Sequence, residues 1–297
     1  MSHFRGQRRN GNQNRWAPKA ALFVALAIHQ LMGQRLEPAV DFTDEAALSR
    51  DTTVGQRSAV ALEDLSAIHL NTDTSLTISD SPRSRNVLLK KGELYADVRH
   101  DDFRTFRVKV GHALFEDLGT QFDVYTEKRA TTISVTRGEV RIREQHSDGR
   151  VGDPLVSTPA GQKREAVILE RGDLAWVYES DDGIITVKKQ PRDLAEAMRR
   201  VEWLRGKLAF NGQTLDEVAH EFNRYNRSKL IIDDPAIAGL RVGGRYRFND
   251  IEAFLAALKA RNEVEVSVVE ADKTYPREIH LNLKASAGGE GRRRRLR

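Results

Sequence analysis

Histidine is the side chain most often used to bind metals or to move protons at neutral pH, and this 297-residue chain has eight of them. No two stand at the i, i+4 spacing that places a pair of metal ligands on one helix face. There is no cysteine, which excludes thiol catalysis and a disulfide framework. The Gly-x-Gly-x-x-Gly, phosphate-loop and Gly-x-Ser-x-Gly motifs are also absent. We therefore expect no enzyme, no bound cofactor and no metal site.

Two adjacent carboxylate pairs, Asp101-Asp102 and Asp181-Asp182, are the other candidates for acid–base chemistry. Neighbouring side chains on a strand point to opposite faces, so the carboxyls of one pair could not act together. We interpret both pairs as turn residues. A polysaccharide lyase on a β-solenoid would need several charged residues on one strand face, and the sequence offers no such cluster.

Positive charge is concentrated at the two ends of the chain. Lys and Arg outnumber Asp and Glu by 48 to 43, a net charge of +5. No acidic residue precedes Glu37, and five arginines lie within residues 292–297. The body between is slightly acidic, which argues against binding of nucleic acid. The length predicts two domains.

The N-terminal residues predict a membrane anchor. Residues 1–15 are a basic tail, expected in the cytoplasm, and residues 16–33 contain an apolar run that we interpret as a single-pass span of the inner membrane. Residues 34–54 form a linker, and the bulk of the chain would lie in the periplasm. A cleaved signal peptide and a buried helix are the alternatives. No Ala-x-Ala site directly follows the run, which favours the anchor.

Residues 55–188 alternate apolar and polar side chains in short segments. This pattern predicts an all-β domain, either a meander or a short β-solenoid. Phe106 and Phe122 belong to the apolar rows and are expected in the core. Gly92, Gly119 and Gly138 separate the segments, and Gly138 lies where a tight reversal requires positive φ.

The apolar period changes from two to that of a helix after residue 188. Residues 189–202 are predicted to form a linking helix, and residues 203–284 a small α+β domain of two strand–helix–strand (βαβ-βαβ) units. Within it, Thr214 and Glu217 have the spacing of a capping box. Residues 285–297 read as a disordered basic tail.

The order of short motifs in the β domain carries a family resemblance. The motifs are Arg85, Gly92-Glu93 with Tyr95 and Val98, Phe106-Arg107-Val108, Leu118-Gly119-Thr120-Gln121-Phe122-Asp123-Val124, and Val135-Thr136-Arg137-Gly138-Glu139-Val140. They resemble the periplasmic domain of FecR-type anti-sigma factors, the transmembrane signal regulators of iron transport. We interpret the Leu-Gly-Thr-x-Phe motif as structural, with a ligand loop as the alternative.

The α+β domain carries a second resemblance. Its matching residues include Trp203, Gly206, Leu208, Phe210, Leu215, Phe222, Arg224-Tyr225-Asn226 and Asp234-Pro235. They resemble the STN domain, shared by secretins and TonB-dependent receptors, in the version that ends FecR-type proteins. We expect structural roles for Trp203, Phe210 and Tyr225. We interpret Arg224 as a residue that ends its helix, with a surface contact as the alternative.

The two resemblances together imply a signal-transducing regulator. Its partners would be the periplasmic signalling domain of a TonB-dependent outer-membrane receptor for siderophores and a cytoplasmic extracytoplasmic-function (ECF) sigma factor. An exposed strand edge can accept a partner's strand, so we predict docking near residues 241–248. Arg241, Arg245, Tyr246 and Arg247 are the contact candidates.

One departure from the family concerns the sigma factor. FecR-type regulators hold it with a helical domain before the membrane span, whereas only residues 1–15 precede the predicted span here. Either this member has lost the sigma-binding domain, or the protein has a longer N-terminus than the sequence given. The alternative function is a periplasmic envelope scaffold, or a glycan- or partner-binding module, without sigma-factor output.

Overall fold

The computed structural model describes residues 47–81, 85–117, 119–128, 130–261, 263–271 and 276–284. The predicted N-terminal tail, membrane anchor, most of the linker, Leu118 and the basic C-terminal tail lie outside these ranges. Within them, no helix combines the length and apolar character that a membrane crossing requires.

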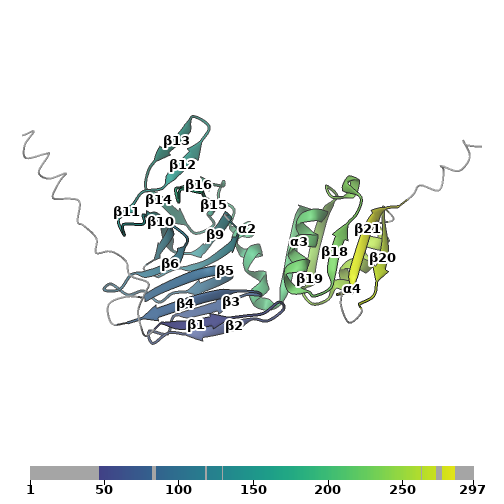
Figure 1. Ribbon diagram of the computed structural model, residues 1–297, viewed down its shortest axis with the longest axis horizontal. Coiled ribbons are helices and arrows are strands. Elements are labelled where there is room, and N and C mark those ends of the chain that lie inside the picture. Colours follow the sequence, from purple (N-terminus) through teal and green to yellow (C-terminus); the bar gives the residue numbers. More distant parts are fainter. Residues whose placement is uncertain are drawn as a thin grey trace, which may run out of the picture. The chain divides into compact units, whose positions relative to one another are not determined.

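The β lobe, residues 48–189, is one curled sheet of sixteen strands among the described residues (Figure 1). The strands are β1 (Leu48–Asp51), β2 (Ser58–Ala61), β3 (Ala67–Leu70), β4 (Ser75–Asp80), β5 (Arg85–Asp97), β6 (Phe106–Val110), β7 (Ala113–Asp117), β8 (Gln121–Glu127), β9 (Ala130–Arg137), β10 (Glu139–Gln145), β11 (Val151–Gly152), β12 (Leu155–Thr158), β13 (Gly161–Arg164), β14 (Val167–Glu170), β15 (Leu174–Glu179) and β16 (Ile185–Lys189).

Most neighbouring strands are antiparallel, and hairpins such as β6–β7, β8–β9 and β15–β16 join strands that follow each other in the chain. Two pairs, β5–β6 and β12–β16, are parallel. The all-β prediction is therefore confirmed. The sheet is not a simple meander, because β5 pairs with β8, β7 with β10 and β9 with β15, which are not consecutive in the chain. The described strands also do not stack as the parallel coils of a β-solenoid.

Strand β5 connects the two halves of the curled sheet. Its first half pairs with β4 and β6, and its second half, from Gly92 onward, pairs with β3 and β8. The backbone bends at Gly92, where φ is +88°. A Cβ atom there would lie 2.5 Å from the Thr74 Cα and 2.7 Å from the Asp73 carbonyl oxygen. Only glycine allows both this φ and this close approach.

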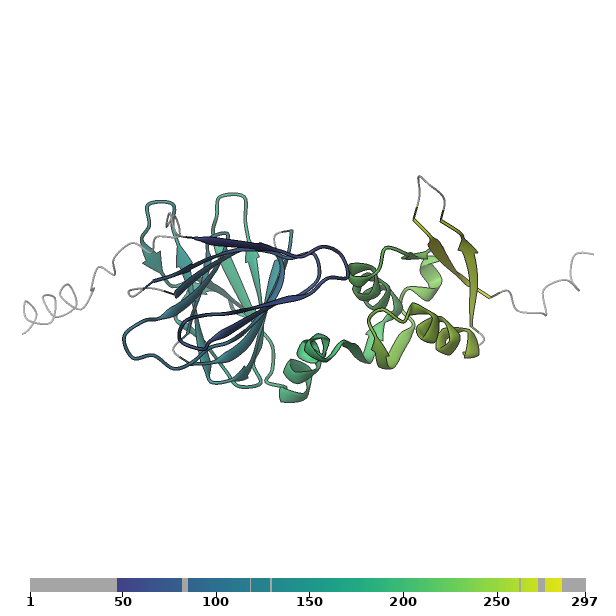
Figure 2. The ribbon, with the colours of Figure 1, turned by 90° about the horizontal axis from the view of Figure 1, so that it is seen from below.

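The strands of the β lobe curl around an interior (Figure 2). The buried apolar side chains of these strands form one core cluster. Strand β6 buries every second side chain, as its alternating sequence predicts. Phe106 and Phe122 are both fully buried, with ring centroids 6.3 Å apart in an edge-to-face arrangement.

Gly119 and Thr120 of the Leu-Gly-Thr-x-Phe motif lie between β7 and β8, and its Phe122 belongs to β8. The buried Asp117 carboxylate accepts hydrogen bonds from the backbone amides of Gly119 at 2.9 Å and Thr120 at 3.1 Å. The Thr120 hydroxyl lies 2.9 Å from the Glu139 carbonyl oxygen. Gly138, with φ of +78°, has no Cβ to collide with that hydroxyl. The motif thus satisfies its own polar groups inside the protein.

Helix α2 (Leu194–Arg200) precedes the C-terminal lobe, residues 201–284. The elements of the lobe are η1 (Val201–Arg205), β17 (Lys207–Thr214), α3 (Leu215–Tyr225), β18 (Lys229–Ile232), η2 (Pro235–Ile237), β19 (Arg241–Arg247), α4 (Ile251–Ala260), β20 (Val264–Val269) and β21 (Glu278–Leu283).

These elements follow the predicted order of strand–helix–strand units and end with an antiparallel β20–β21 pair. Strands β17 and β19 form one small sheet, and β18, β21 and β20 form another. Helix α3 contacts strands of both sheets. It begins at the predicted capping box, in which the Thr214 hydroxyl accepts from the Glu217 amide at 3.2 Å.

We predict that Gly92→Ala lowers the free energy of unfolding by about 2–4 kcal/mol, because the methyl group collides with the backbone of the β3–β4 turn. Gly161→Ala is the matched control, since Gly161 also has positive φ but has no atom within 4 Å of its virtual Cβ. That control should lose about 1 kcal/mol from backbone strain alone. Urea denaturation measures the free energy of unfolding of both variants. Equal decreases in the two variants would contradict a role for close packing at Gly92.

Candidate functional site

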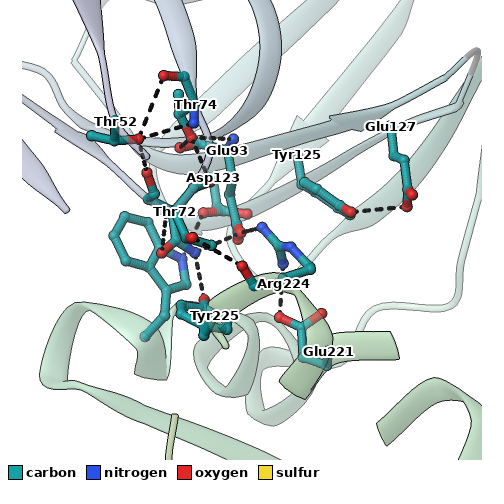
Figure 3. A network of polar contacts seen from close by, with 12 residues as sticks. Thr52, Thr72, Thr74, Glu93, Asp123, Tyr125, Glu127, Glu221, Arg224 and Tyr225 are labelled. Atoms are coloured by element: carbon teal, nitrogen blue, oxygen red, sulfur yellow. Dashed lines mark hydrogen bonds and ion pairs between the residues drawn. The ribbon is translucent and has the colours of Figure 1, made fainter. Parts of the chain in front are cut away.

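The last turn of helix α3 lies against the β lobe, and its arginine lies at the centre of a buried polar network (Figure 3). The Arg224 guanidinium donates through Nη2 to Glu93 of β5 and through Nη1 to Glu221 Oε1 at 2.7 Å. It also stacks 3.9 Å above the Tyr125 ring of β8. The Arg224 side chain is only 12% exposed. We call this contact region the joint.

Tyr225 supplies the second contact from the same helix turn. Asn71 Nδ2, in the β3–β4 turn, donates to the Tyr225 hydroxyl at 2.6 Å and to Glu93 Oε2 at 2.8 Å. The Thr72 hydroxyl donates to the Arg224 carbonyl oxygen at 3.0 Å. Because Asn71 and Glu93 are both buried, these bonds satisfy polar groups that water does not reach.

Three threonines fix the β-lobe side of the joint. Thr52 donates to the Asn71 carbonyl oxygen at 2.6 Å. The Thr74 hydroxyl accepts from the Glu93 amide at 3.0 Å. Thr72 donates its amide to Asn71 Oδ1 at 2.8 Å. Hydrogen bonds within the β lobe therefore hold Asn71 and the rest of the β3–β4 turn in place.

A second group of contacts surrounds Trp203 in η1. Its indole Nε1 donates to the buried Asp123 Oδ1 at 3.3 Å. Arg57 donates to the Trp203 carbonyl oxygen at 2.5 Å and lies 4.7 Å from the centroid of the Phe248 ring. These contacts join η1 to strand β8 and to Arg57, the residue before strand β2.

Burial and neighbouring charges shift the pKa values of the ionisable groups in the joint. Burial, and next the charge of Glu93, raise the pKa of Asp123 well above its usual range. Burial also raises the pKa of Glu221, although Arg224 opposes this. Burial disfavours the Arg224 charge, but Glu221 and Glu93 outweigh it and raise its pKa. Asp123 therefore favours its neutral form, while Arg224 stays charged.

The joint offers no arrangement for catalysis. Its carboxylates are directed at a guanidinium and an indole N–H rather than at a nucleophile. Nowhere in the described ranges do three or more His, Cys, Asp or Glu side chains gather so that they could hold a metal ion. What this geometry can do is join two lobes through a buried charge cluster.

The predicted docking residues lie on β19, away from the joint. Alternate residues of a strand share a face, so Arg241, Arg245 and Arg247 lie together on the exposed face. Tyr246 lies on the opposite face, with its ring 5.4 Å from the Phe254 centroid. In the described chain β19 pairs only with β17. Docking at this strand stays a prediction.

Sequence reasoning missed the joint. The interpretation of Arg224 as a helix-ending residue is incomplete, because its guanidinium contacts the β lobe instead of solvent near the helix end. Trp203, Phe210 and Tyr225 lie in the core of the C-terminal lobe, where Tyr95 of the β lobe joins them. Glu93 and Arg224 each belong to a motif singled out in the sequence, but 131 positions separate them and no spacing rule connects the two.

Comparison with known proteins identifies the β lobe. Residues 50–141 match the family model described as FecR protein. The matched range contains the β-lobe residues of the joint, Asn71, Glu93 and Asp123 among them. The resemblance of the β domain to FecR-type proteins is therefore confirmed over this range, whereas the resemblance of residues 203–284 to the STN domain stays a prediction.

Two crystal structures of a candidate anti-sigma factor from Parabacteroides distasonis ATCC 8503, at 1.65 Å and 2.50 Å resolution, are similar in fold. They are 21% and 22% identical to this chain, and each has a TM-score of 0.59. Both comparisons cover 80% of this chain and 100% of the other. At this identity the likeness shows a shared fold. No curated protein matches the chain significantly.

We predict that Arg224→Met lowers the free energy of unfolding by about 3 kcal/mol, because it leaves Glu93 and Glu221 without their cation. Hydrogen exchange should also accelerate in helix α3. Arg150→Met is the control, since Arg150 pairs with Asp148 at the surface, where the two side chains are 77% and 47% exposed. It should cost less than about 1 kcal/mol. Equal losses would show that the buried cluster does not hold the joint.

We predict that Asp123→Asn stabilises the protein at neutral pH but not at acidic pH. The folded protein favours the neutral Asp123 carboxyl. The stability that this carboxyl contributes to the fold is therefore fully present below its unfolded pKa of about 3.9. That stability is lost as pH rises through the raised pKa of the folded state. Asn keeps an acceptor for Trp203 and cannot ionise. The difference in unfolding free energy between variant and wild type should therefore grow with pH from about pH 4 upward. A constant difference would contradict this.

Proposed function

We propose that this protein is a FecR-like regulator that carries a signal across the inner membrane as a single-pass protein with its bulk in the periplasm. It senses the signalling domain of a TonB-dependent outer-membrane receptor for siderophores and controls an ECF sigma factor. The FecR match over residues 50–141 supports a regulator, and the fold shared with candidate anti-sigma factors agrees with it.

The observation that carries the proposal is the joint between the FecR domain and helix α3. Arg224 contacts Glu93 across it, and Thr72 and Asn71 contact the backbone and side chain of the same helix turn. A shift of helix α3 by about 1–2 Å would separate the buried Arg224 guanidinium from one of its carboxylate partners. The cluster therefore favours one discrete position of the helix, and a partner that moves α3 would alter the FecR domain with it.

The partner surface that we propose is the exposed face and open edge of β19. Three arginines share this face, so it suits a partner strand with acidic or hydrogen-bond-accepting side chains. The side chains on its other face, Val242 and Tyr246, pack on the lobe and keep the strand in place. Helix α3 contacts β19, which gives a short physical route from this surface to Arg224.

We predict that Arg245→Glu combined with Arg247→Glu weakens binding of the full chain to the purified receptor signalling domain by at least about tenfold, because like charges then face the partner. Lys163→Glu combined with Arg171→Glu is the control, since both residues are exposed on the β lobe. Surface-immobilised signalling domain measures the dissociation constants. Unchanged affinity of the β19 variant would place docking elsewhere, and no binding by wild type would reject the receptor as partner.

A further inference from the structure

A trough runs along the outer face of the β lobe, and the strand register builds it. Residues of β8, β9 and β15 pair in rows across the sheet: Tyr125 with Thr132 and then Trp176, and in the next row Glu127 with Ala130 and then Tyr178. The middle strand thus carries small side chains and the two outer strands carry large ones. The large side chains of β8 form one bank of the trough and those of β15 form the other. The two banks are two strand spacings, or about 10 Å, apart.

The side chains of β15 alternate between core and trough. Ala175 and Val177 are buried, whereas Trp176 is half-buried and Tyr178 is 44% exposed. Trp176 and Tyr178 therefore lie on the same outward face, two residues or about 7 Å apart along the strand. Neither ring belongs to the core cluster of the β lobe, although Ala175 and Val177 of the same strand do.

The opposite bank is polar and is held in place by the joint. Arg224 covers one face of the Tyr125 ring, and the Tyr125 hydroxyl donates to Glu127 Oε2 at 2.9 Å. His220 of helix α3 lies 3.0 Å from the same carboxylate oxygen. Glu179 and Lys128 complete the rim of a groove of about 550 Å³. That volume falls in the range of about 300–1,000 Å³ that is usual for ligand sites.

We propose that this trough binds a neutral saccharide chain. A pyranose ring has an apolar C–H face, which suits the flat rings of Trp176 and Tyr178, and an equatorial rim of hydroxyls. The carboxylate of Glu127 and the hydroxyls of Thr132 and Tyr178 can hydrogen-bond to that rim. Aromatic faces combined with polar tips, and with no aliphatic side chain larger than Ala130, are the composition that such a ligand requires.

Two other kinds of ligand fit this surface less well. An extended peptide that adds to a sheet needs a free strand edge, but β8, β9 and β15 are each paired on both sides. A peptide held by its side chains needs aliphatic pockets, which the lining lacks. A phosphate or sulfate group would meet two carboxylates in the lining of the groove, Glu127 and Glu179, against Lys128 and His220, and His220 already faces Glu127.

The experiment titrates the full chain with cellohexaose, maltohexaose and chitohexaose, with heparin as an anionic control. Binding is measured by isothermal titration and by the change in tryptophan fluorescence that is present in wild type and lost in Trp176→Ala. We expect at least one neutral hexasaccharide to bind, heparin not to compete, and Trp176→Ala to weaken affinity by about tenfold or more. Tyr178→Ala should weaken it less, and Ala130→Trp should block it by filling the floor.

Phe103→Ala is the matched control, because Phe103 is a 95% exposed aromatic residue on a different loop. It should bind as the wild type does, and the thermal unfolding of every variant should match the wild type. Failure of all three neutral hexasaccharides to bind, or equal binding by Trp176→Ala and Phe103→Ala, would overturn the proposal. The proposal would also be overturned if the wild type bound an unfolded peptide instead of a saccharide and Trp176→Ala did not. That result would assign the trough to a protein ligand.

Discussion

A guanidinium buried between carboxylates is the interaction on which the rest of this structure depends. Removing Arg224 from water costs several kcal/mol, and the cost is offset only if both Glu93 and Glu221 keep their positions. Glu93 in turn depends on Asn71 and on the β3–β4 turn. The network is thus satisfied only as a whole, and a satisfied buried network favours a single geometry.

The bend in β5 and the joint have the same origin. Gly92 allows the β3–β4 turn to approach β5 closely enough for Thr74 to bond the backbone of Glu93. The next residue along the chain therefore points its carboxylate at helix α3. One glycine both curls the sheet and orients the acid that holds the helix, which links the architecture of the FecR domain directly to its contact with the C-terminal lobe.

The joint also lies between two surfaces of different character. On one side, β19 presents arginines and an open strand edge; on the other, the trough presents aromatic rings on a fully paired sheet. Tyr125 belongs to both the joint and the trough, since Arg224 stacks on its ring and Glu127 accepts from its hydroxyl. Occupancy of the trough and the position of helix α3 therefore act on the same side chain.

Local spacing in the sequence was enough to predict the secondary structure and the FecR-type domain at residues 50–141. Period-two alternation predicted the strands, Thr214 and Glu217 the start of α3, and the ordered motifs the FecR domain, because each depends on residues close together in the chain. Only the tertiary structure brought Glu93 to Arg224 and aligned Tyr125 with Trp176. Those contacts depend on strand register and on packing between distant segments, and neither is encoded in local spacing.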